Sequence, residues 1–369
     1  MKVLLVNKLY SPWIGGIETV TKDLAEGLQG AGFEAEVLAC APKGGGSNEE
    51  IGGVLVHKAA SFGIFLSTPL SLDFFKQFRH YAREADIIFL QHPFPLATLA
   101  HLFFARKKTV VVWYHADIER QKIANIFFAP FLRRSLAHAA RIFVTGKNMI
   151  EHSSCLRPLR SRCAIIPYGI DLSRFTEGED IRNIAASIRV QFGAPLILAA
   201  GRLVPYKGFE YLIRAMRGLP AKLVIVGNGP LEAELKKCAA NEGLGSQIFF
   251  VDHVPDLVPY FFACDLFAFP SIYKTEAFGI VQLEAMACGK SVVNTNLPTT
   301  VPEVSIDGET GYTVPPCDAT ALHRAMAAMM HDAALRERFG KAARKRVEDV
   351  FSKERFIAAV ADALRPLAG

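Results

Sequence analysis

At 369 residues the chain is too long for one ordinary hydrophobic core, which suggests two domains. Apolar residues make up 51% of the sequence and charged residues 21%, a balance that excludes a disordered or fibrous chain. The 7 cysteines show no metal-ligand spacing, and the first residues lack the flanks of a targeting sequence. No apolar run approaches the roughly 20 residues of a membrane-spanning helix. We therefore expect a cytoplasmic protein with reduced thiols.

Positive charge is concentrated in the first half of the chain. Residues 1–170 hold 20 Lys and Arg against 13 Asp and Glu, whereas residues 171–369 hold 22 against 23. A basic half is suited to an anionic partner such as a membrane surface or a lipid-diphosphate acceptor. Ordinary surface charge is the alternative interpretation.

The chain begins with an apolar run, residues 2–8, that predicts a buried strand. A loop with Gly15 and Gly16 follows, and then apolar residues at helical spacing from Val20 to Leu28. Glycines at a strand-to-helix turn let a ligand approach the backbone closely. The pattern is not G-x-G-x-x-G, so a dinucleotide site gains no support.

The rest of the first half alternates between strands and helices. We expect strands at 35–41, 54–58, 86–90 and 109–114, helices at 74–83 and 96–105, and a flexible polar loop at 43–48. Such alternation predicts parallel sheets, whose ligands bind beyond the carboxyl ends of the strands. His92 and His115 follow two of these strands, and for His92 we prefer a structural role. Asp117 is a candidate to orient His115 or to bind an acceptor.

A segment rich in aromatic and basic residues comes next. Residues 126–143 predict a helix followed by a strand. The residues concerned are Phe127, Phe128, Phe131, Leu132, Arg133, Arg134 and Arg141, with Arg106, Lys107 and Lys108 upstream. Aromatic and basic side chains together suit a helix lying on an anionic bilayer. Core packing with a charged rim is the alternative, and from the sequence we favour it.

The second half of the chain starts a new α/β series. A strand and turn are expected at 164–171 and a linker at 176–182. The expected strands that follow are 196–200, 222–226, 248–251 and 291–295. Helices are expected at 209–217, from Pro230, twice within 318–346, and last at 353–367. Arg202 and Lys207 follow the strand at 196–200. A guanidinium fork and a lysine point charge at a strand end are the groups that a diphosphate needs.

The most informative stretch is residues 273–290, which follow a predicted buried strand. Glu276 lies in the strand-to-helix loop, and Glu284 lies on the second turn of the helix that follows. Three amides between them lie at a helix N-terminus, which favours an anion: those of Phe278, Gly279 and Ile280. Carboxylates beside an anion site suit a ligand that carries both phosphate and hydroxyl groups. That describes a nucleotide-sugar.

The two glutamates, with seven residues between them and Phe-Gly after the first, resemble the signature of the retaining glycosyltransferases of family 4. The resemblance implies the α/β GT-B fold, in which two Rossmann-like parallel-sheet domains face each other across a cleft and a C-terminal helix crosses back to the first domain. On this basis we place an acceptor-side domain at 1–172, a nucleotide-sugar domain at 173–351 and the returning helix at 352–369.

The resemblance also implies roles for residues of this chain. The expected donor-binding residues are Gly15 and Gly16 facing the diphosphate, Arg202 and Lys207 binding it, Gly227 and Asn228 bordering the nucleotide, and Val254 with its backbone against the base. Glu276 would hold sugar hydroxyls, Glu284 would hold the ribose, and His115 would position the sugar. Two positions depart from the family pattern: Tyr168 stands where Asn is frequent, and Thr299-Thr300 stands where a glycine pair is common.

The implied reaction is transfer of a sugar from a nucleoside-diphosphate sugar to a hydroxyl, with the anomeric configuration retained. The chain has no Asp-x-Asp motif, and Arg202 and Lys207 supply two cations, so we expect neither a metal ion nor another cofactor. The stretches 11–18 and 272–284 look most like bacterial mannosyl- and rhamnosyltransferases of polysaccharide assembly, which use GDP-sugars. GDP-mannose is therefore the predicted donor, and a UDP-sugar is the alternative.

Other classes of protein stay open from the sequence. A GT-B epimerase would consume the donor without an acceptor, a GT-B phosphorylase would release sugar phosphate from a polysaccharide, and a nucleotide-sugar-binding protein would have no turnover. A nucleic-acid-binding protein is supported only by the pI of about 8.9 and lacks a recognition motif. The expected acceptor is a glycan or a lipid-linked glycan that the sequence does not identify, and peripheral association with the inner face of a membrane stays open.

Overall fold

The chain folds into two compact units. The structure, a computed structural model, describes residues 1–13, 15–117 and 122–367, apart from the side chains of residues 122–126. Unit 1 comprises Met1–Gly169 and Lys353–Gly369, and unit 2 comprises Ile170–Ser352. Ile14, in the predicted glycine loop, lies outside the described residues, as does the side chain of Ile126.

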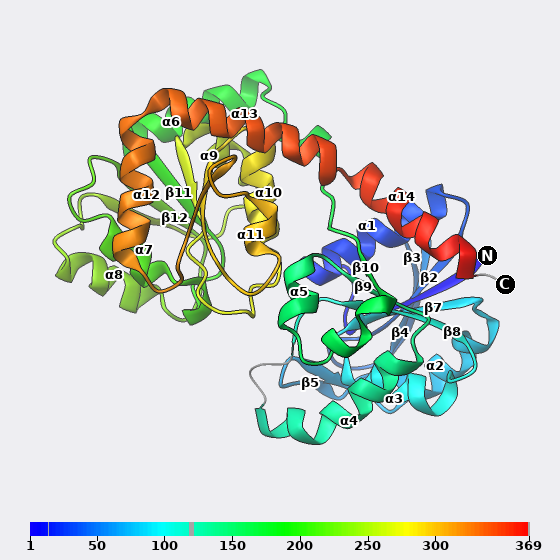
Figure 1. Cartoon of the computed structure of the whole chain (residues 1–369). Helices are drawn as coiled ribbons and strands as arrows, with labels where there is room; N and C mark the ends of the chain where they lie inside the picture. Colours follow the sequence, from blue (N-terminus) through cyan, green and yellow to red (C-terminus); the bar gives the residue numbers. More distant parts are fainter. Residues whose placement is uncertain (14, 118–121, 368–369) are drawn as a thin grey trace. The chain divides into compact units, whose positions relative to one another are not determined.

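The described part of unit 1 is built on an eight-stranded sheet (Figure 1). In spatial order its strands are β10 (Cys163–Ile165), β9 (Arg141–Val144), β8 (Thr109–Tyr114), β7 (Ile87–His92), β1 (Lys2–Val6), β2 (Glu34–Cys40), β4 (Val54–Ala59) and β3 (Ser47–Ile51). The strands run parallel, except that β3 is antiparallel to β4 at one edge. Strands with helices on both faces read as continuous apolar runs, which is why β1, β7 and β8 were recognisable in the sequence.

Helices cover both faces of this sheet. One face carries α1 (Gly16–Gly30) and α14 (Lys353–Leu364), the other carries α2 (Asp73–Glu84), α3 (Pro95–Phe104) and α4 (Lys122–His138), and α5 (Lys147–His152) and the 3-10 helix η1 (Arg157–Arg162) follow β9 (Figure 1). Successive strand residues point to opposite faces. Val112 of β8 therefore joins the core under α2, α3 and α4, while its neighbour Trp113 packs on Phe356 of α14 with ring centroids 5.4 Å apart.

The described part of unit 2 holds a six-stranded sheet in which every pair is parallel. Its strands, in spatial order, are β13 (Ile248–Val251), β12 (Lys222–Val226), β11 (Leu196–Ala200), β14 (Leu266–Ala268), β15 (Val292–Thr295) and β16 (Gly311–Val314). The chain starts at β11, builds outward to β13, and then continues on the other side of β11 with β14. This reversal of strand order is where doubly wound sheets bind their ligands.

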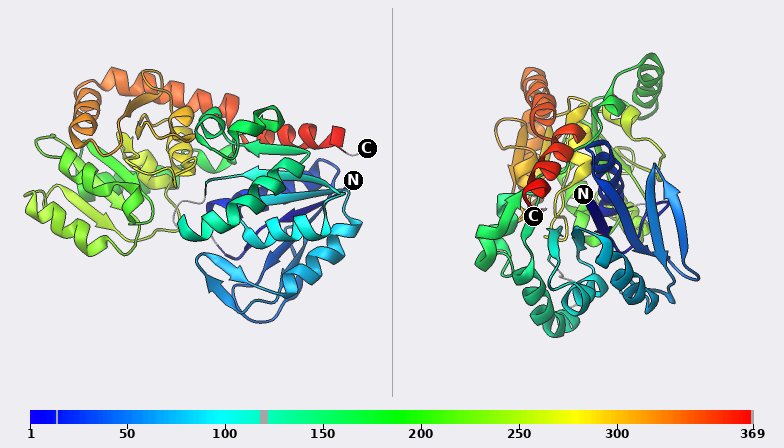
Figure 2. Two further views of the ribbon diagram at one scale, coloured as in Figure 1. Left: turned by 60° about the horizontal axis from the view of Figure 1, so that its bottom comes forward. Right: turned by 90° about the vertical axis from the view of Figure 1, so that its right-hand side faces the viewer.

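Helices again lie on both faces of the sheet of unit 2 (Figures 1 and 2). They are α6 (Glu179–Phe192), α7 (Phe209–Ala215), α8 (Glu232–Asn241), α9 (Val258–Ala263), α10 (Ile280–Ala287), α11 (Val301–Val304), α12 (Ala319–His331) and α13 (Ala333–Val350), with the 3-10 helices η2 (Leu172–Phe175) and η3 (Pro205–Lys207). Aspartates begin the two long helices: Asp318 accepts from Ala321 N at 2.8 Å, and Asp332 accepts from Leu335 N at 2.8 Å. Such caps satisfy amides that the helix leaves unpaired.

Most sequence predictions of elements are confirmed, and several strands coincide with their predicted ranges, but three predictions were wrong. β3 begins inside the polar loop predicted at 43–48, because an exposed edge strand needs no apolar pattern. α6 begins inside the linker predicted at 176–182. Pro230 does not start a helix, because it lies in a turn and α8 begins at Glu232.

A short hairpin in unit 1 was not predicted. β5 (Gly63–Phe65) and β6 (Thr68–Leu70) pair antiparallel between β4 and α2. In the part of the chain that the structure describes, no helix combines the length and the apolar character needed to cross a bilayer.

Candidate active site

The loops that follow β11 and β14 carry the central side chains of the site. Both strands are parallel neighbours, so their following loops leave the same edge of the sheet. Lys207, the last residue of η3, and Glu276 thereby come together, with Nζ and Oε2 2.6 Å apart. The sequence prediction that these two residues converge on one site agrees with this geometry.

The Lys207–Glu276 pair is held from several sides. Ser271 Oγ donates to Glu276 Oε2 at 3.0 Å, and the carbonyl of Ser271 accepts from Thr295 Oγ1 at 2.5 Å. The Lys207 ammonium lies 4.9 Å from the centroid of the Phe269 ring, a cation–π distance. The pair is therefore pre-positioned. Sequence reasoning missed Ser271 and Thr295, although Ser271 follows the end of β14 closely.

Gly279 begins α10 in a conformation that only glycine adopts easily. Its φ is +79°, and a Cβ there would lie 2.7 Å from two atoms of the Phe269 ring. Phe278 is buried against Phe351, so it can face a ligand only through its backbone. The buried Gln282 donates to Phe278 O at 2.8 Å and thereby fixes the turn that precedes the helix. Ile280 is the first helical residue.

Glu284 lies on the second turn of α10, as predicted. Its burial raises the pKa of the carboxyl from 4.5 to about 7, with Asp256 adding to the rise and Arg174 opposing it. The side chain is half-buried. A carboxyl with this pKa changes charge near neutral pH, which makes its hydrogen bonding to a ligand pH-dependent.

The predicted nucleotide loops of unit 2 are joined through their backbones. Leu203 N, next to the exposed Arg202, donates to Asn228 O at 2.8 Å. Gly227 has a φ of +138° and lies against the carbonyl of Gly201, so a side chain would clash there. The loops after β11 and β12 thus form one surface. Val254 is half-buried in the loop after β13, the strand beyond β12.

Gly15 and Gly16 mark the start of α1 in unit 1. Gly15 is the N-cap in extended conformation, and Gly16 is exposed as the first helical residue. The carboxylate of Glu18 folds back over Gly15, where a Cβ would lie 3.1 Å from Glu18 Cδ. The absence of a side chain at Gly15 therefore makes room for Glu18, a buried residue that sequence reasoning did not single out.

His115 follows β8 and is buried with both ring nitrogens engaged. Nε2 lies 2.5 Å from Gln91 Oε1, and Nδ1 bonds the hydroxyl of Tyr168. An amide oxygen only accepts, so we assign the proton to Nε2, and Tyr168 donates to Nδ1. Burial lowers the pKa of His115 to about 3, so the ring is neutral. To hydrogen-bond a sugar through a ring nitrogen, His115 would have to give up one of these two bonds.

The neighbouring groups of unit 1 are arranged separately. Burial lowers the pKa of His92 to about 3, and its ring stacks on Tyr114 with centroids 4.6 Å apart, in keeping with the structural role preferred for it. Asp117 accepts hydrogen bonds from the Tyr114 hydroxyl and, at 2.9 Å, from Ser153 Oγ.

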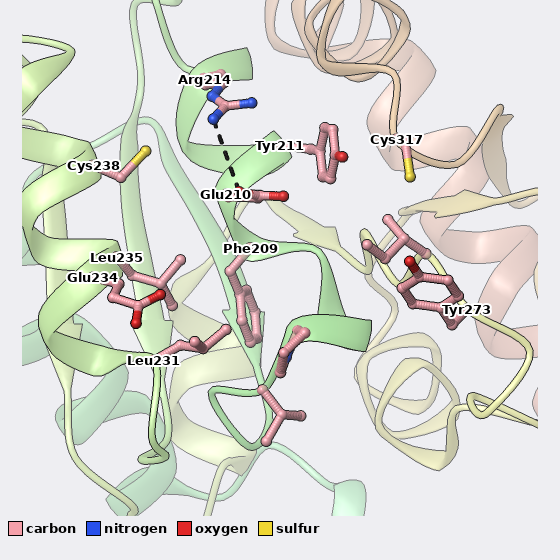
Figure 3. A pocket seen from close by; sticks show the side chains of 13 residues that line it. Phe209, Glu210, Tyr211, Arg214, Leu231, Glu234, Leu235, Cys238, Tyr273 and Cys317 are labelled. Atoms are coloured by element: carbon pink, nitrogen blue, oxygen red, sulfur yellow. Dashed lines mark ion pairs between the residues drawn. The ribbon is translucent and has the colours of Figure 1, made fainter. Parts of the chain in front are cut away.

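A cavity of about 370 Å³ lies in unit 2 beside α7 and α8 (Figure 3). Its walls include Phe209, Leu231 and Tyr273, and Glu210 pairs with Arg214 at 3.8 Å on one side. The cavity shares segments with the loops that carry Lys207 and Glu276. Of the described residues that line it, none is a predicted site residue, so it adjoins the candidate site without being part of it.

Comparisons with known proteins identify the family. A model described as "Glycosyltransferase Family 4" matches residues 14–174, and one described as "Glycosyl transferases group 1" matches residues 180–346. A D-rhamnosyltransferase of Pseudomonas aeruginosa is 34% identical over 358 residues, which cover 95% of this chain and 92% of the relative. The chain belongs to glycosyltransferase family 4. An O-antigen chain mannosyltransferase of Escherichia coli is 31% identical, with 97% of this chain and 96% of the relative covered.

Solved structures show the same fold. A sucrose-phosphate synthase from Thermosynechococcus elongatus superposes with a TM-score of 0.82 at 23% identity. The superposition covers 99% of this chain and 98% of the synthase chain. The predicted GT-B class is confirmed by this likeness together with the parallel sheets of both units. The family models and the aligned relatives, and not the fold alone, make the protein a glycosyltransferase. The donor-binding and catalytic roles of the individual residues stay predictions.

Proposed function

We propose that this glycosyltransferase moves mannose from GDP-mannose to a hydroxyl of a glycan or lipid-linked glycan, with retention of configuration and without a metal ion. The observation that carries the proposal is the Lys207–Glu276 pair, a cation and a carboxylate fixed 2.6 Å apart where the strand order reverses. A phosphate needs the cation and a sugar needs the carboxylate, so the pair suits the two halves of a nucleotide-sugar.

The proposed mechanism depends on the charge that builds on the departing diphosphate. Lys207 and the exposed Arg202 neutralise this charge, and the N-terminus of α10 adds the favourable end of a helix dipole. These two cations take the part that a metal ion plays in many sugar transferases, which is the basis for proposing metal independence. Glu276 holds the sugar hydroxyls, and Glu284 accepts from the ribose.

The choice of donor and acceptor is supported by the relatives. Two relatives that align over nearly the whole chain are named as a D-rhamnosyltransferase and an O-antigen chain mannosyltransferase. This agrees with the sugar class implied by the residues around Glu276. The predicted roles of Gly15, Gly16 and His115 in unit 1 are retained as part of the same proposal.

The test is a calorimetric and thermal-shift comparison of GDP-mannose, UDP-glucose and UDP-N-acetylglucosamine, each with and without EDTA. We expect stabilisation by GDP-mannose that EDTA leaves unchanged. The Lys207→Met variant should lose this stabilisation, whereas Lys237→Met, which removes an exposed lysine from α8, should retain it. Preference for a UDP-sugar, or stabilisation that chelation abolishes, contradicts the donor or the metal-independent mechanism.

Retention is tested by following the anomeric proton of the product by NMR with glycan acceptors. An α-linked mannoside from the α-linked donor is expected, and a β-linked product contradicts retention. Incubation of GDP-mannose without acceptor should leave the configuration of the sugar unchanged. Conversion of the sugar under these conditions would instead indicate a GT-B epimerase.

A further inference from the structure

The cavity of unit 2 beside α7 and α8 takes no part in the proposed reaction. Its volume of about 370 Å³ lies at the lower end of the range of roughly 300–1,000 Å³ that small-molecule sites occupy. Such sites combine apolar and aromatic walls with a few polar groups that orient the ligand. The side chains that line this cavity are of both kinds.

Apolar side chains form much of the wall. The buried Phe209 lies beside Leu231 and Leu235 of α8, and the rings of Tyr211 and Tyr273 line the side of the cavity away from α8 (Figure 3). Tyr273 exposes 59% of its surface, so its ring is available to a ligand. The face of an aromatic ring carries partial negative charge and attracts the positive edge of a C–H bond.

Three charged side chains supply the polar part of the wall. Glu210 Oε2 and Arg214 Nη2 are 3.8 Å apart, which is too long for a hydrogen bond, so this pair keeps acceptors and donors for a ligand. Glu234 is exposed on α8, and in the described part of the chain no group pairs with or hydrogen-bonds to its carboxylate. The cavity therefore offers two acceptors of high strength and one planar donor.

The balance of these charges limits the class of ligand. Two carboxylates against one guanidinium disfavour an anion such as a phosphate, and Arg214 disfavours a simple cation. A neutral ligand rich in hydroxyl groups fits best, because hydroxyls donate to carboxylates and accept from guanidinium. A pyranose ring carries its hydroxyls at the rim and presents C–H bonds on its face. The wall thus has the chemistry of a carbohydrate site.

The cavity borders the loops that carry Lys207 and Glu276. Pro205, which lines it, begins the 3-10 helix that ends at Lys207, and Tyr273 precedes Glu276 by three residues. Ile272 N donates to Tyr206 O at 2.8 Å, so the two loops are joined at the edge of the cavity. A ligand there would lie beside the candidate site without occupying it.

We propose that this cavity is a second carbohydrate-binding site, which holds a short neutral segment of the glycan that the enzyme extends. The sugar rings stack on Tyr211 and Tyr273, and their hydroxyls bond to Glu210, Arg214 and Glu234. The carbohydrate class is argued from the cavity, whereas the choice of mannose as the sugar rests on the proposed function. Retention of the product at this site keeps a growing chain on the enzyme between transfers.

The first experiment uses a thiol of the cavity as the probe. All seven cysteines lie in the described part of the chain, and Cys317 is exposed, lines the cavity and lies beside Tyr211 (Figure 3). At a concentration of α-linked mannotriose about ten times its Kd, alkylation of Cys317 by iodoacetamide should slow by about tenfold. Mass spectrometry of the peptides measures the rate, and Cys155 of unit 1 should react as before. Binding of mannotriose at an acceptor site elsewhere would not cover Cys317, and absence of protection overturns the proposal.

Small ligands of different charge test the predicted class. Methyl α-mannoside should protect Cys317 better than mannose 6-phosphate at the same concentration, because the carboxylates repel the phosphate. Spermidine should not protect it. Equal protection by the phosphorylated sugar, or better protection by spermidine, would overturn the assignment to a neutral carbohydrate.

The second experiment removes single groups from the wall. Glu234→Gln takes away a charged acceptor and Tyr273→Ala an aromatic face, and each should raise the mannotriose concentration needed for protection by about tenfold. Glu232→Gln, on the same helix but outside the cavity, and Phe103→Ala, at an exposed ring of unit 1, should behave like the parent. Equal loss in the controls, or no loss in the cavity variants, overturns the site. Thermal melting identifies any variant that fails to fold.

The third experiment measures the length of the glycan formed from GDP-mannose and a short acceptor. Glu234→Gln should give shorter products, because the chain leaves the enzyme earlier, whereas the rate of the first transfer should stay that of the parent. An unchanged length distribution would overturn the retention of the product by this site.

These outcomes separate the two proposals. Protection of Cys317 by mannotriose, without response to GDP-mannose, would leave the carbohydrate site standing and remove the proposed donor. Binding of GDP-mannose without protection by mannotriose would do the reverse. Protection by GDP-mannose alone would assign the cavity to the donor and overturn the second site.

Discussion

At the scale of single residues, the Lys207–Glu276 ion pair governs how the proposed donor site would bind a diphosphate. The two side chains are largely buried, and their separation is 2.6 Å. A diphosphate that binds Lys207 has to share the ammonium with Glu276, whose charge repels it. The carboxylate is thus unfavourable for the phosphates and favourable for sugar hydroxyls.

Replacement of Glu276 should therefore strengthen the binding of GDP and weaken catalysis. We expect Glu276→Gln to tighten binding of GDP by about fivefold, because Lys207 is released from its ion pair. The same variant should lower kcat with GDP-mannose by about tenfold or more, because a charged hydrogen-bond acceptor for the sugar is lost. Calorimetry and initial rates measure the two effects. Glu232→Gln, which breaks the exposed 2.7 Å pair with Lys236, is the control. Weaker GDP binding in Glu276→Gln would contradict the sharing of Lys207.

Glu284 should make donor binding depend on pH. Burial raises the pKa of its carboxyl to about 7, so the charged form that best accepts from ribose hydroxyls is present above that pH and lost below it. We expect the affinity for GDP-mannose to fall by up to about tenfold per pH unit below 7. In Glu284→Gln the affinity should be lower near pH 8 and this pH dependence should disappear. An unchanged slope in the variant would assign the titration to another group.

The same carboxyl affects the stability of the unliganded protein. Its folded pKa of about 7 lies above the ordinary value of 4.5, so the folded state binds more protons between these values. This preferential proton binding adds to the free energy of unfolding. The added stability is full below pH 4.5 and is lost as the pH rises through 7, with a total on the order of 3 kcal/mol. The unfolding free energy of the parent, measured relative to that of Glu284→Gln, should therefore fall between pH 4.5 and pH 7.

Tyr168 should contribute to stability through His115. Tyr168→Phe removes the hydroxyl that donates to His115 Nδ1 and leaves a buried acceptor unpaired. The expected cost is about 1–3 kcal/mol of unfolding free energy. Tyr273→Phe, at an exposed phenol, should cost much less. Chemical denaturation measures both variants, and equal effects would contradict the role of the hydrogen bond.

The sequence predicted that Lys207 and Glu276 converge, because their convergence depends on topology alone. Lys207 and Glu276 follow adjacent parallel strands, and this brings them to one edge of a sheet. The sequence could not predict that Gln91 and Tyr168 engage both nitrogens of His115. These two residues lie 24 and 53 positions from His115 in the chain, and no local pattern links them to it. Gln282 was missed for a related reason, since its buried amide reads as an ordinary helix residue.

At the scale of secondary-structure elements, patterns with a buried apolar face were recognised and others were not. β8 and β11 are buried runs, so their ranges were predicted correctly. β3 has the sequence SNEEI and an exposed or half-buried surface throughout, so nothing distinguishes it from a polar loop. In α6 the buried Ala185, Ile188 and Phe192 have helical spacing, but the charged residues that precede them suggested a linker.

The contact between α1 and α14 should be sensitive to a single methyl group. A Cβ at Gly27 of α1 would lie 2.5 Å from Ile357 Cγ1 of α14. Gly27→Ala should therefore lower the unfolding free energy by about 1–3 kcal/mol through overpacking, despite the better helix propensity of alanine. Ile357→Ala alone should also destabilise, through a cavity.

The double variant distinguishes overpacking from other effects. When Gly27→Ala is combined with Ile357→Ala, the new methyl group occupies space that the isoleucine has vacated. We expect the double variant to be more stable than the sum of the single changes predicts, by about 1 kcal/mol or more. Strict additivity would contradict direct contact between the two residues.

At the scale of the whole molecule, the last helix belongs to the unit that the chain left long before. The chain passes from unit 1 to unit 2 after Gly169 and returns after Ser352. The side chains of α14 complete the core of unit 1: Phe356, Ile357, Val360 and Leu364 are buried. Phe356 also packs on Trp113 and on Tyr168. The folding of unit 1 thus depends on residues synthesised after all of unit 2.

Deletion of residues 353–369 should consequently destabilise unit 1 and spare unit 2. Four large buried side chains are lost, at about 1.5–3 kcal/mol each, and the total of about 6–12 kcal/mol is comparable to the whole stability of a typical domain. Both tryptophans of the chain, Trp13 and Trp113, lie in unit 1, so their emission reports this unit alone. We expect the emission of the truncated protein to be that of a solvent-exposed indole at temperatures where circular dichroism still shows a cooperative transition from unit 2. A native tryptophan spectrum in the truncated protein would show that α14 is dispensable for the core of unit 1.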